Sequence, residues 1–178
     1  METVLPAPNA TTADFDTAAR LHRPAIFRFL AASLRDTHTA ENLTQECLLR
    51  AFQARDSFRG EASVKTWLMQ IAVNVLRNHL SNARFNFWKR NQQGEINVAP
   101  VDPHSSPEAA ALARQQIEAV WKAATKLSER QRTVFLLRFV EDMDLLDIAA
   151  ATGLSEGTVK SHLFRAVQSV RQQLEGTK

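Results

Sequence analysis

Apolar residues recur every three or four positions through most of this 178-residue chain, which is the spacing of amphipathic helices. The clearest stripe runs through Val64, Trp67, Leu68, Ile71, Ala72, Val75, Leu76 and Leu80. No stretch alternates with the two-residue period of a half-buried strand over a useful length. The pattern therefore predicts an all-α protein.

Two helical segments are expected before this stripe, after a polar, proline-marked tail at residues 1–13. The first begins at Asp14 and contains Pro24, which predicts either a new helix or a kink there. The second spans residues 40–55, after a polar break at residues 35–39. Its buried stripe is predicted to be Leu43, Cys47, Leu48, Ala51 and Phe52. Its other side carries Glu and Gln, which fits either an ordinary solvated surface or a protein-binding face.

The third helix is predicted to begin at Val64, because Gly60 interrupts the preceding helix and Ser63 can act as an N-cap. Opposite the apolar stripe lie amides, hydroxyls and cations without a single carboxylate: Lys65, Thr66, Gln70, Asn74, Arg77, Asn78 and Ser81. Such groups can contact phosphates and the edges of unstacked bases. This face is therefore a candidate for binding nucleic acid.

Aromatic and basic residues alternate just beyond this helix, in the sequence ARFNFWKRNQQ that starts at Ala83. Stacking on bases and capping of the domain fit this segment equally well. From Gln93 the composition shifts to Gly, Asn, Pro and Ser, which indicates a linker over residues 93–108. We thus expect two small helical domains, at residues 14–92 and 109–178, joined by a flexible linker.

The second domain is predicted to contain four short helices. The first spans residues 109–125, and Ser128 with Gln131 forms a capping-box pattern that opens the next. The last two, within residues 144–170, surround Gly153, which suits the left-handed backbone just past a helix end. This spacing is typical of a helix-turn-helix.

The final helix is expected to begin at Glu156 after the N-cap Ser155, with one apolar stripe at Val159, Leu163, Ala166 and Val170. Away from that stripe lie Thr158, Lys160, Ser161, Arg165 and Gln168. A helix fits the major groove of B-DNA, where basic and hydroxyl side chains reach base edges and phosphates. The alternative is a helical hairpin whose outer face is only solvated.

Charge is unevenly distributed, although the net charge is only +3. The acid-free stretch between Glu61 and Glu95 carries five cations: Lys65, Arg77, Arg84, Lys89 and Arg90. An acidic cluster follows at Glu141, Asp142, Asp144 and Asp147. Such segregation suits an anionic partner at one place and a basic partner at another, although each run taken singly fits a solvated surface.

The composition is that of a globular protein, with 44% hydrophobic residues. It offers few residues for disulfide bonds or metal binding. The single cysteine, Cys47, excludes a disulfide framework and is expected to be buried. The five histidines lack metal-ligand spacing, and no signal peptide or membrane-spanning run is evident. We therefore expect a cytoplasmic protein with no metal, no cofactor and no catalytic activity of its own.

Three ordered segments, ENLTQECLLRAF, FRGEASVKTWLMQIAVN and LSERQRTVFLLRFVEDMDLLDIAAATGLSEGTVKSHLFRA, resemble the sigma-70 family of bacterial transcription initiation factors. The short two-domain layout is similar to the extracytoplasmic-function (ECF) group of that family. The resemblance covers roughly residues 15–174. It implies region 2 of a sigma factor in the first domain and region 4 in the second.

The resemblance also implies the role of each face. Contact with the β′ clamp helices of core RNA polymerase would involve Glu41, Leu43, Gln45 and Glu46. Contact with the promoter −10 element would involve Arg59, Gly60, Ser63, Lys65, Trp67, Gln70 and Asn74. Contact with the −35 element would involve Thr158, Lys160, Ser161, Phe164 and Arg165. Phe164 could touch a thymine methyl group or sugar, or pack at the edge of its own apolar stripe.

Three departures from the family pattern bear on these roles. Asn42 stands where many members have an acid, and Lys160 stands where relatives often have Arg, whose bidentate fork Lys lacks. The acidic cluster at residues 141–147 is richer than usual, and the sequence gives no account of its role beyond electrostatic contact with the polymerase or an inhibitor.

The implied partners are core RNA polymerase (β′ clamp helices and β flap), promoter DNA and an anti-sigma factor, without membrane insertion. Two other functions are compatible with the residues alone. One is a dimeric helix-turn-helix regulator that binds an operator. The other is an interaction protein that sequesters a factor without touching DNA.

Overall fold

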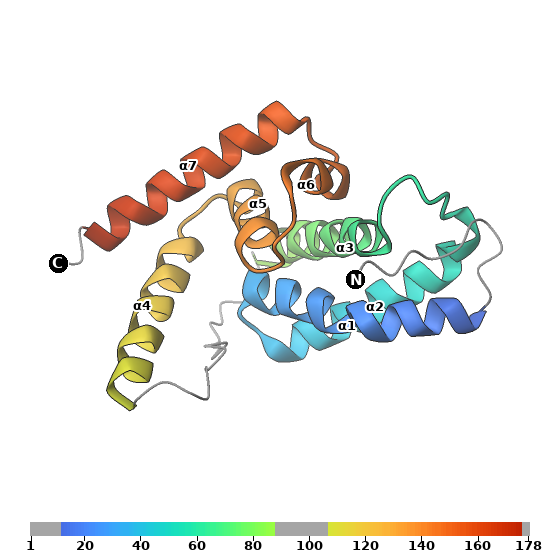
Figure 1. The fold of residues 1–178 in the computed structure, drawn as a ribbon, viewed down its shortest axis with the longest axis horizontal. Coiled ribbons are helices and arrows are strands. Elements are labelled where there is room, and N and C mark those ends of the chain that lie inside the picture. The colour runs from blue at the N-terminus through green and yellow to red at the C-terminus, as the bar shows by residue number, and fades with distance from the viewer. Residues whose placement is uncertain (1–11, 88–106, 176–178) are drawn as a thin grey trace.

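The computed structural model describes residues 12–87 and 107–175, and these residues form helices joined by short loops (Figure 1). In chain order the elements are α1 (Thr12–Leu34), α2 (Thr37–Ala54), the short 3-10 helix η1 (Arg55–Ser57), α3 (Val64–Phe87), α4 (Pro107–Thr125), α5 (Glu129–Phe139), α6 (Leu145–Thr152) and α7 (Glu156–Glu175). The predicted all-α class in two regions is confirmed. Most of the predicted linker lies outside the described residues.

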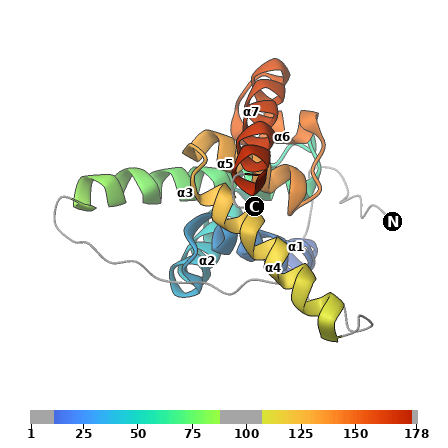
Figure 2. The same ribbon diagram turned by 90° about the vertical axis from the view of Figure 1, so that its left-hand side faces the viewer.

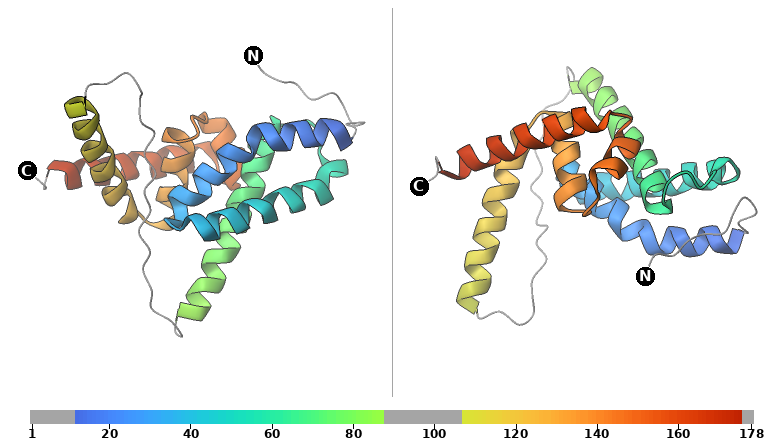
Figure 3. Two further views of the ribbon diagram at one scale, coloured as in Figure 1. Left: turned by 90° about the horizontal axis from the view of Figure 1, so that it is seen from below. Right: turned by 45° about the horizontal axis from the view of Figure 1, so that its top comes forward.

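Helices α1, α2 and α3 pack together around fully buried apolar side chains, among them Ile26, Phe29, Cys47 and Leu68. Helix α1 continues through Pro24, so the prediction of a new helix there was wrong. The helix changes direction along its length, as the predicted kink would require (Figure 3). Pro24 explains this change of direction. It has no N–H to donate within the helix, and its ring pushes away the carbonyl group one turn earlier.

Local hydrogen bonds explain where the next two helices begin. Helix α2 starts three residues before the predicted position, because the Asp36 carboxylate accepts the N–H groups of His38 at 3.0 Å and Thr39 at 3.2 Å. Helix α3 starts at Val64 as predicted, with the Thr66 N–H donating to Ser63 Oγ at 3.1 Å. It continues past the predicted stripe to Phe87 and so includes Phe85 and Phe87, the first two of the aromatic residues in that segment.

Helices α4 to α7 follow the predicted boundaries closely. Helix α4 begins at Pro107 instead of residue 109. Proline is favoured in a first helical turn, because backbone N–H groups there have no hydrogen-bond partner within the helix and the lack of one costs nothing. The capping box at α5 is confirmed, with the Gln131 N–H donating to Ser128 Oγ and the Ser128 N–H donating to Gln131 Oε1. Asp144 caps α6 by accepting the Asp147 N–H at 2.8 Å.

The helix-turn-helix consists of α6 and α7. Gly153 follows α6 with φ of 70°, the left-handed value that the sequence predicted. The Thr158 N–H donates to Ser155 Oγ at 3.2 Å, which confirms Ser155 as the cap of α7. Val159 and Ala166 have no exposed surface and Val170 is buried, so the apolar stripe of α7 faces the core.

The two helical groups lie against each other. Helix α6 sits between α7 and α3, and the main contact between the groups is α6 against α3, with α5 against α1 beside it (Figures 1 and 2). Buried side chains from both groups belong to one connected apolar cluster. The domains predicted from the sequence are therefore held together in this structure.

Two glycines in the helix-turn-helix give a matched test of backbone geometry. A Cβ at either Gly153 or Gly157 would meet no atom within 4 Å, but only Gly153 has positive φ. We expect Gly153→Ala to lower the free energy of unfolding by about 1 kcal/mol, because an L side chain is strained there. Gly157→Ala should instead stabilise the protein by up to ~1 kcal/mol, since alanine favours helix. Urea denaturation measures both, and equal effects would contradict this explanation.

Candidate nucleic-acid interface

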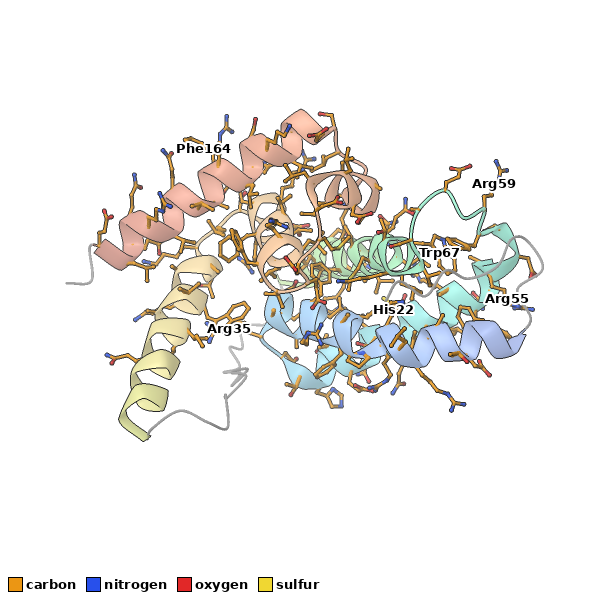
Figure 4. All side chains as sticks on the ribbon, in the orientation of Figure 1. His22, Arg35, Arg55, Arg59, Trp67 and Phe164 are labelled. Carbon is orange, nitrogen blue, oxygen red and sulfur yellow. The ribbon has the colours of Figure 1, made fainter. Side chains whose placement is uncertain are left out.

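The predicted recognition face of α7 is exposed. Lys160, Ser161, Phe164 and Arg165 are all exposed, and Thr158 is half-buried beside the turn. Phe164 exposes 63% of its surface and projects away from the core (Figure 4), so it does not pack at the edge of the stripe. The apolar stripe on the opposite side of α7 fixes this orientation.

Two side chains of this face have local partners. The Lys160 ammonium lies 2.6 Å from the Glu156 carboxylate one turn earlier, and Ser161 Oγ donates to the Gly157 carbonyl at 2.9 Å. Exposed ion pairs of this kind contribute little to stability. Lys160 can therefore exchange Glu156 for a phosphate at small energetic cost, while Arg165 has no hydrogen-bond or ion-pair partner among the described residues.

A hollow of about 430 Å³ lies where the loop before α3 meets the first turns of that helix. Phe58 and Trp67 form one wall, with ring centroids 5.0 Å apart, and Arg59, Gln70 and Ala150 also line the hollow. Arg59 points outward from the loop (Figure 4). Aromatic faces beside amide and guanidinium groups suit an unstacked base.

Gly60 gives the loop beside this hollow its turn, with φ of 71°, and Ser63 ends the loop by capping α3. On α3, Gln70 and Asn74 are exposed and Trp67 is half-buried. The loop and helix thus bring most of the residues predicted for the −10 element to one side of the first helical group.

Sequence reasoning missed Phe58 and Ala150 as lining residues of the hollow. Phe58 could have been noticed as an aromatic residue beside the Gly60 turn. Ala150 comes from α6, and no pattern in the sequence indicates that α6 reaches this loop.

Part of the predicted outward face of α3 contacts α6 and the loop before it, while Asn78 and Ser81 are exposed. Thr66 is only 2% exposed, and its Oγ1 donates to Asp147 Oδ1 at 2.7 Å. Lys65 Nζ donates to the Glu141 carbonyl, and Arg77 Nη2 donates to the Thr152 carbonyl at 3.3 Å. Thr66, which the sequence placed on the outward face, is therefore buried. Periodicity places a residue on a face but does not say what packs against that face.

The acidic cluster separates into distinct roles. Asp144 caps α6, and Asp147 accepts from Thr66. Glu141 has no exposed side-chain surface and accepts two hydrogen bonds from Arg28 of α1, at 2.9 Å and 3.3 Å. Asp142 projects into solvent, with 97% of its side chain exposed, and Asp144 is exposed as well. Two carboxylates of the cluster thus contact the first helical group, and contact of the cluster with the polymerase or an inhibitor is not tested by this structure.

Burial raises the pKa of Glu141 above its ordinary value. The hydrogen bonds and positive charge of Arg28 oppose this shift, and Lys65 adds a further opposing charge, but desolvation is the larger effect. The charged carboxylate is therefore held in an environment that destabilises it, and Arg28 compensates for only part of that penalty.

The predicted polymerase-binding residues on α2 divide into exposed and buried. Gln45 is exposed, whereas Glu41 and Glu46 are half-buried and pair with Arg23 and Arg50, respectively. Leu43 is only 7% exposed and belongs to the core. Leu43 thus supports the helix, and of the four predicted residues it is the polar ones, Glu41, Gln45 and Glu46, that present surface to a partner.

Other chemical sites are not evident in the described part of the chain. No group of three His, Cys, Asp or Glu residues within residues 12–87 and 107–175 could hold a metal ion. Cys47 is buried, and burial raises the pKa of its thiol to about 12, which makes it unreactive as a nucleophile. Among the helices that the structure describes, none is long and apolar enough to span a membrane.

The fold and the site together define a helix-turn-helix transcription factor made of two helical parts. Residues 18–85 match the family model described as Sigma-70 region 2, and residues 117–170 match Sigma-70, region 4. The chain is 31% identical to the RNA polymerase sigma-H factor of Pseudomonas aeruginosa, over 90% of this chain and 86% of that protein. The chain belongs to the sigma-70 family, and within it to the ECF group.

Other relatives agree with this assignment. The ECF RNA polymerase sigma-E factor of Escherichia coli is 27% identical, over 75% of this chain and 73% of that protein. The sigma factor RpoE from Bartonella quintana, solved in complex with the anti-sigma factor NepR, superposes with a TM-score of 0.73 at 25% identity, covering 92% of this chain and 98% of that one. CnrH in complex with the cytosolic domain of CnrY shares the fold, with a TM-score of 0.68 at 19% identity over 96% and 94% of the two chains.

The raised pKa of Glu141 predicts how stability depends on pH. A raised pKa means that the stabilisation from protonated Glu141 is fully present below the ordinary value of 4.5 and is lost as pH rises through the higher folded-state value. Glu141→Gln cannot ionise, so we expect its free energy of unfolding to increase relative to that of the unmodified protein over this pH range. Urea denaturation across a pH series measures the difference, and a constant difference would contradict the assignment.

Proposed function

We propose that this ECF sigma factor binds core RNA polymerase through α2 and directs it to promoters by reading two DNA elements, with α3 and its preceding loop at −10 and α7 at −35. The observation that carries the proposal is the presence of two separate polar faces, one in each helical part. Each lies within the segment that matches the corresponding sigma-70 region. The chain itself performs no chemistry in this scheme and acts in the cytoplasm, beside the polymerase.

At the −35 element α7 enters the major groove of duplex DNA. Arg165 and Lys160 supply positive charge to phosphates or guanine edges, and Thr158 and Ser161 supply hydroxyls. The exposed ring of Phe164 supplies an apolar surface for a thymine methyl group or sugar. Because Lys160 lacks the planar fork of arginine, its contact contributes charge more than base discrimination.

At the −10 element the hollow beside the Gly60 turn accepts a base that leaves the stack. Trp67 and Phe58 provide stacking surface, and Gln70 in the hollow can both donate and accept hydrogen bonds at a base edge, as can the exposed Asn74 one turn further along α3. Arg59 supplies a cation for the backbone. Holding an extruded base stabilises the opened strands, which is how this part of the chain would assist promoter melting.

On α2 the polar residues Glu41, Gln45 and Glu46 form the surface proposed for the β′ clamp helices of the polymerase, with region 4 meeting the β flap. The half-buried carboxylates of Glu41 and Glu46, each paired with an arginine of this chain, favour a basic partner surface that can replace those arginines. An anti-sigma factor is proposed as the controlling partner, supported by the structural similarity to RpoE, which was solved with the anti-sigma factor NepR.

Run-off transcription tests the proposed function directly. Promoters are first mapped by sequencing RNA 5′ ends after overexpression of the protein, and these templates are transcribed with core polymerase with and without it. Specific transcripts are expected only when the protein is present. A dimeric regulator would instead bind an operator and initiate nothing with core polymerase, and that result would overturn the proposal.

Two sets of substitutions should separate DNA binding from polymerase binding. Arg165→Ala should weaken binding of the holoenzyme to the −35 duplex by about tenfold or more, with polymerase binding unchanged. Gln45→Ala combined with Glu46→Ala should weaken binding to core polymerase by about tenfold, without loss of DNA contact by region 4. Electrophoretic mobility shift and fluorescence titration with labelled core polymerase provide the two measurements.

Matched controls exist for both sets. Arg171→Ala removes an exposed arginine from the same helix as Arg165, and Gln115→Ala with Glu118→Ala removes an exposed glutamine and glutamate from α4. Both controls should leave the two affinities nearly unchanged. Equal loss of DNA binding and of polymerase binding in both test variants would contradict the proposed assignment of α7 to DNA and α2 to the polymerase.

A further inference from the structure

A second hollow, of about 290 Å³, lies where α3 of the first helical part meets α5 and the end of α6 in the second. Helix α6 packs along α3 there and also touches α5 (Figures 1 and 2). We call this the inter-region hollow. Residues of α3, of the first turns of α5 and of the turn after α6 line it, and none of them is among the residues proposed to contact polymerase or promoter DNA.

Much of the wall of the inter-region hollow is apolar. Val73 and Leu76 of α3 and Val134 of α5 are buried, and Leu154 after the turn is half-buried. Gly153 contributes no side chain, and a Cβ there would meet no atom within 4 Å, so space remains beside the turn. An apolar ring or chain placed in the hollow would be removed from water, which is favourable.

Two exposed arginines, Arg77 and Arg130, also line the inter-region hollow. Arg77 Nη2 donates to the Thr152 carbonyl at 3.3 Å, which uses one of the five N–H groups of the guanidinium and holds it near the end of α6. Arg130 has no hydrogen bond or ion pair within the part of the chain that the structure describes. It lies in the first turn of α5, where the helix dipole favours a negative charge.

The remaining polar side chains limit what these arginines can bind. Thr133 Oγ1 donates to the Glu129 carbonyl at 2.9 Å, and Thr152 Oγ1 donates to the Ile148 carbonyl at 2.6 Å. The guanidinium groups are therefore the side-chain donors that the hollow still offers. The Glu129 carboxylate also lines it, so two cations and one anion leave a single net positive charge. That balance favours a singly charged anion over a polyphosphate.

We propose that the inter-region hollow is a binding site for a small organic acid: a monocarboxylate held by Arg77 and Arg130, with its apolar body on Val73, Leu76 and Val134. Guanidinium groups bind carboxylates through charge-assisted hydrogen bonds, often in pairs. The volume is at the low end of the roughly 300–1,000 Å³ of ligand pockets, which restricts the ligand to a small molecule.

Both helical parts contribute to this site. Arg77 comes from region 2 and Arg130 from region 4, so the site is complete only while the two parts are in contact. A ligand that binds only this arrangement stabilises it in proportion to its concentration and affinity. The site would thus make the contact between the regions responsive to a small organic acid.

Titration of the full-length protein with benzoate, followed by NMR of the backbone amides, tests the site. Benzoate combines one carboxylate with one apolar ring. Saturable shifts are expected, concentrated at Thr133, Gly153 and Leu154, with a Kd of about 1 mM for so small a ligand. Benzamide, which has nearly the same shape and no charge, should bind about tenfold more weakly, and inorganic phosphate, which lacks the ring, should also bind more weakly.

Substitutions examine the charged and apolar parts of the site separately. Arg130→Ala should weaken benzoate binding about fivefold or more and affect benzamide little, and the helices should stay in place because Arg130 has no partner to lose among the described residues. Thr133→Phe places a ring in the hollow and should weaken binding of both probes. Lys126→Ala is the matched control, because Lys126 is an exposed cation just before α5 that does not line the hollow. Its Kd should stay within about twofold of that of the unmodified protein, since an exposed charge away from the ligand contributes little.

The outcomes decide the proposal without reference to transcription. Shifts spread over the surface, or the same benzoate affinity in Arg130→Ala and Thr133→Phe, would overturn the site. Equal affinity for benzamide would overturn the role of the arginines, and equal affinity for phosphate would reduce the site to simple attraction of anions and overturn the organic-acid assignment. Because no polymerase or DNA is present, absence of run-off transcripts would overturn the sigma function and leave this result unaffected.

Discussion

The burial of the Glu141 carboxylate between the two helical parts is the constraint on which the observed arrangement depends. A charged group removed from water is destabilised unless it is paired, and the pairing here comes from Arg28, which lies 113 residues earlier in the chain. The acidic loop meets α1 through Arg28 and α3 through Lys65, which donates to the Glu141 carbonyl. The docking of α6 along α3 and of α5 against α1 follows from that position.

Because of this docking, the polar face of α3 has a binding partner within the same chain. An acid-free row of amides and cations is suited to nucleic acid, and the same chemistry is suited to a carboxylate and backbone carbonyls of region 4. Lys65 and Thr66 engage region 4, while Gln70 and Asn74 remain exposed. The −35 face on α7 is exposed except at the half-buried Thr158, so the two proposed DNA-binding faces differ in accessibility within a single structure.

Membership of the sigma-70 family and local chemistry could both be predicted from the sequence, because they depend on residues close together in the chain. Ser128 and Gln131 predicted their own capping box, Gly153 predicted a left-handed turn, and Ser63 and Ser155 predicted the starts of α3 and α7. Each of these features is decided by hydrogen bonds within four residues. The apolar stripes were predictable for the same reason, since helical periodicity is local. The assignment of individual residues to polymerase, −10 and −35 contacts stays a prediction.

What the sequence could not determine was the partner of each polar face. It placed Thr66 on an outward face and left the acidic cluster without an intramolecular partner, because neither the helical period nor the charge of a loop specifies what lies opposite. Only the tertiary structure brought Glu141 to Arg28 and Asp147 to Thr66. The sequence by itself determined two helical parts, a helix-turn-helix and the family. The fold decided that the parts meet, since that contact joins residues far apart in the chain and arises from packing rather than from local pattern.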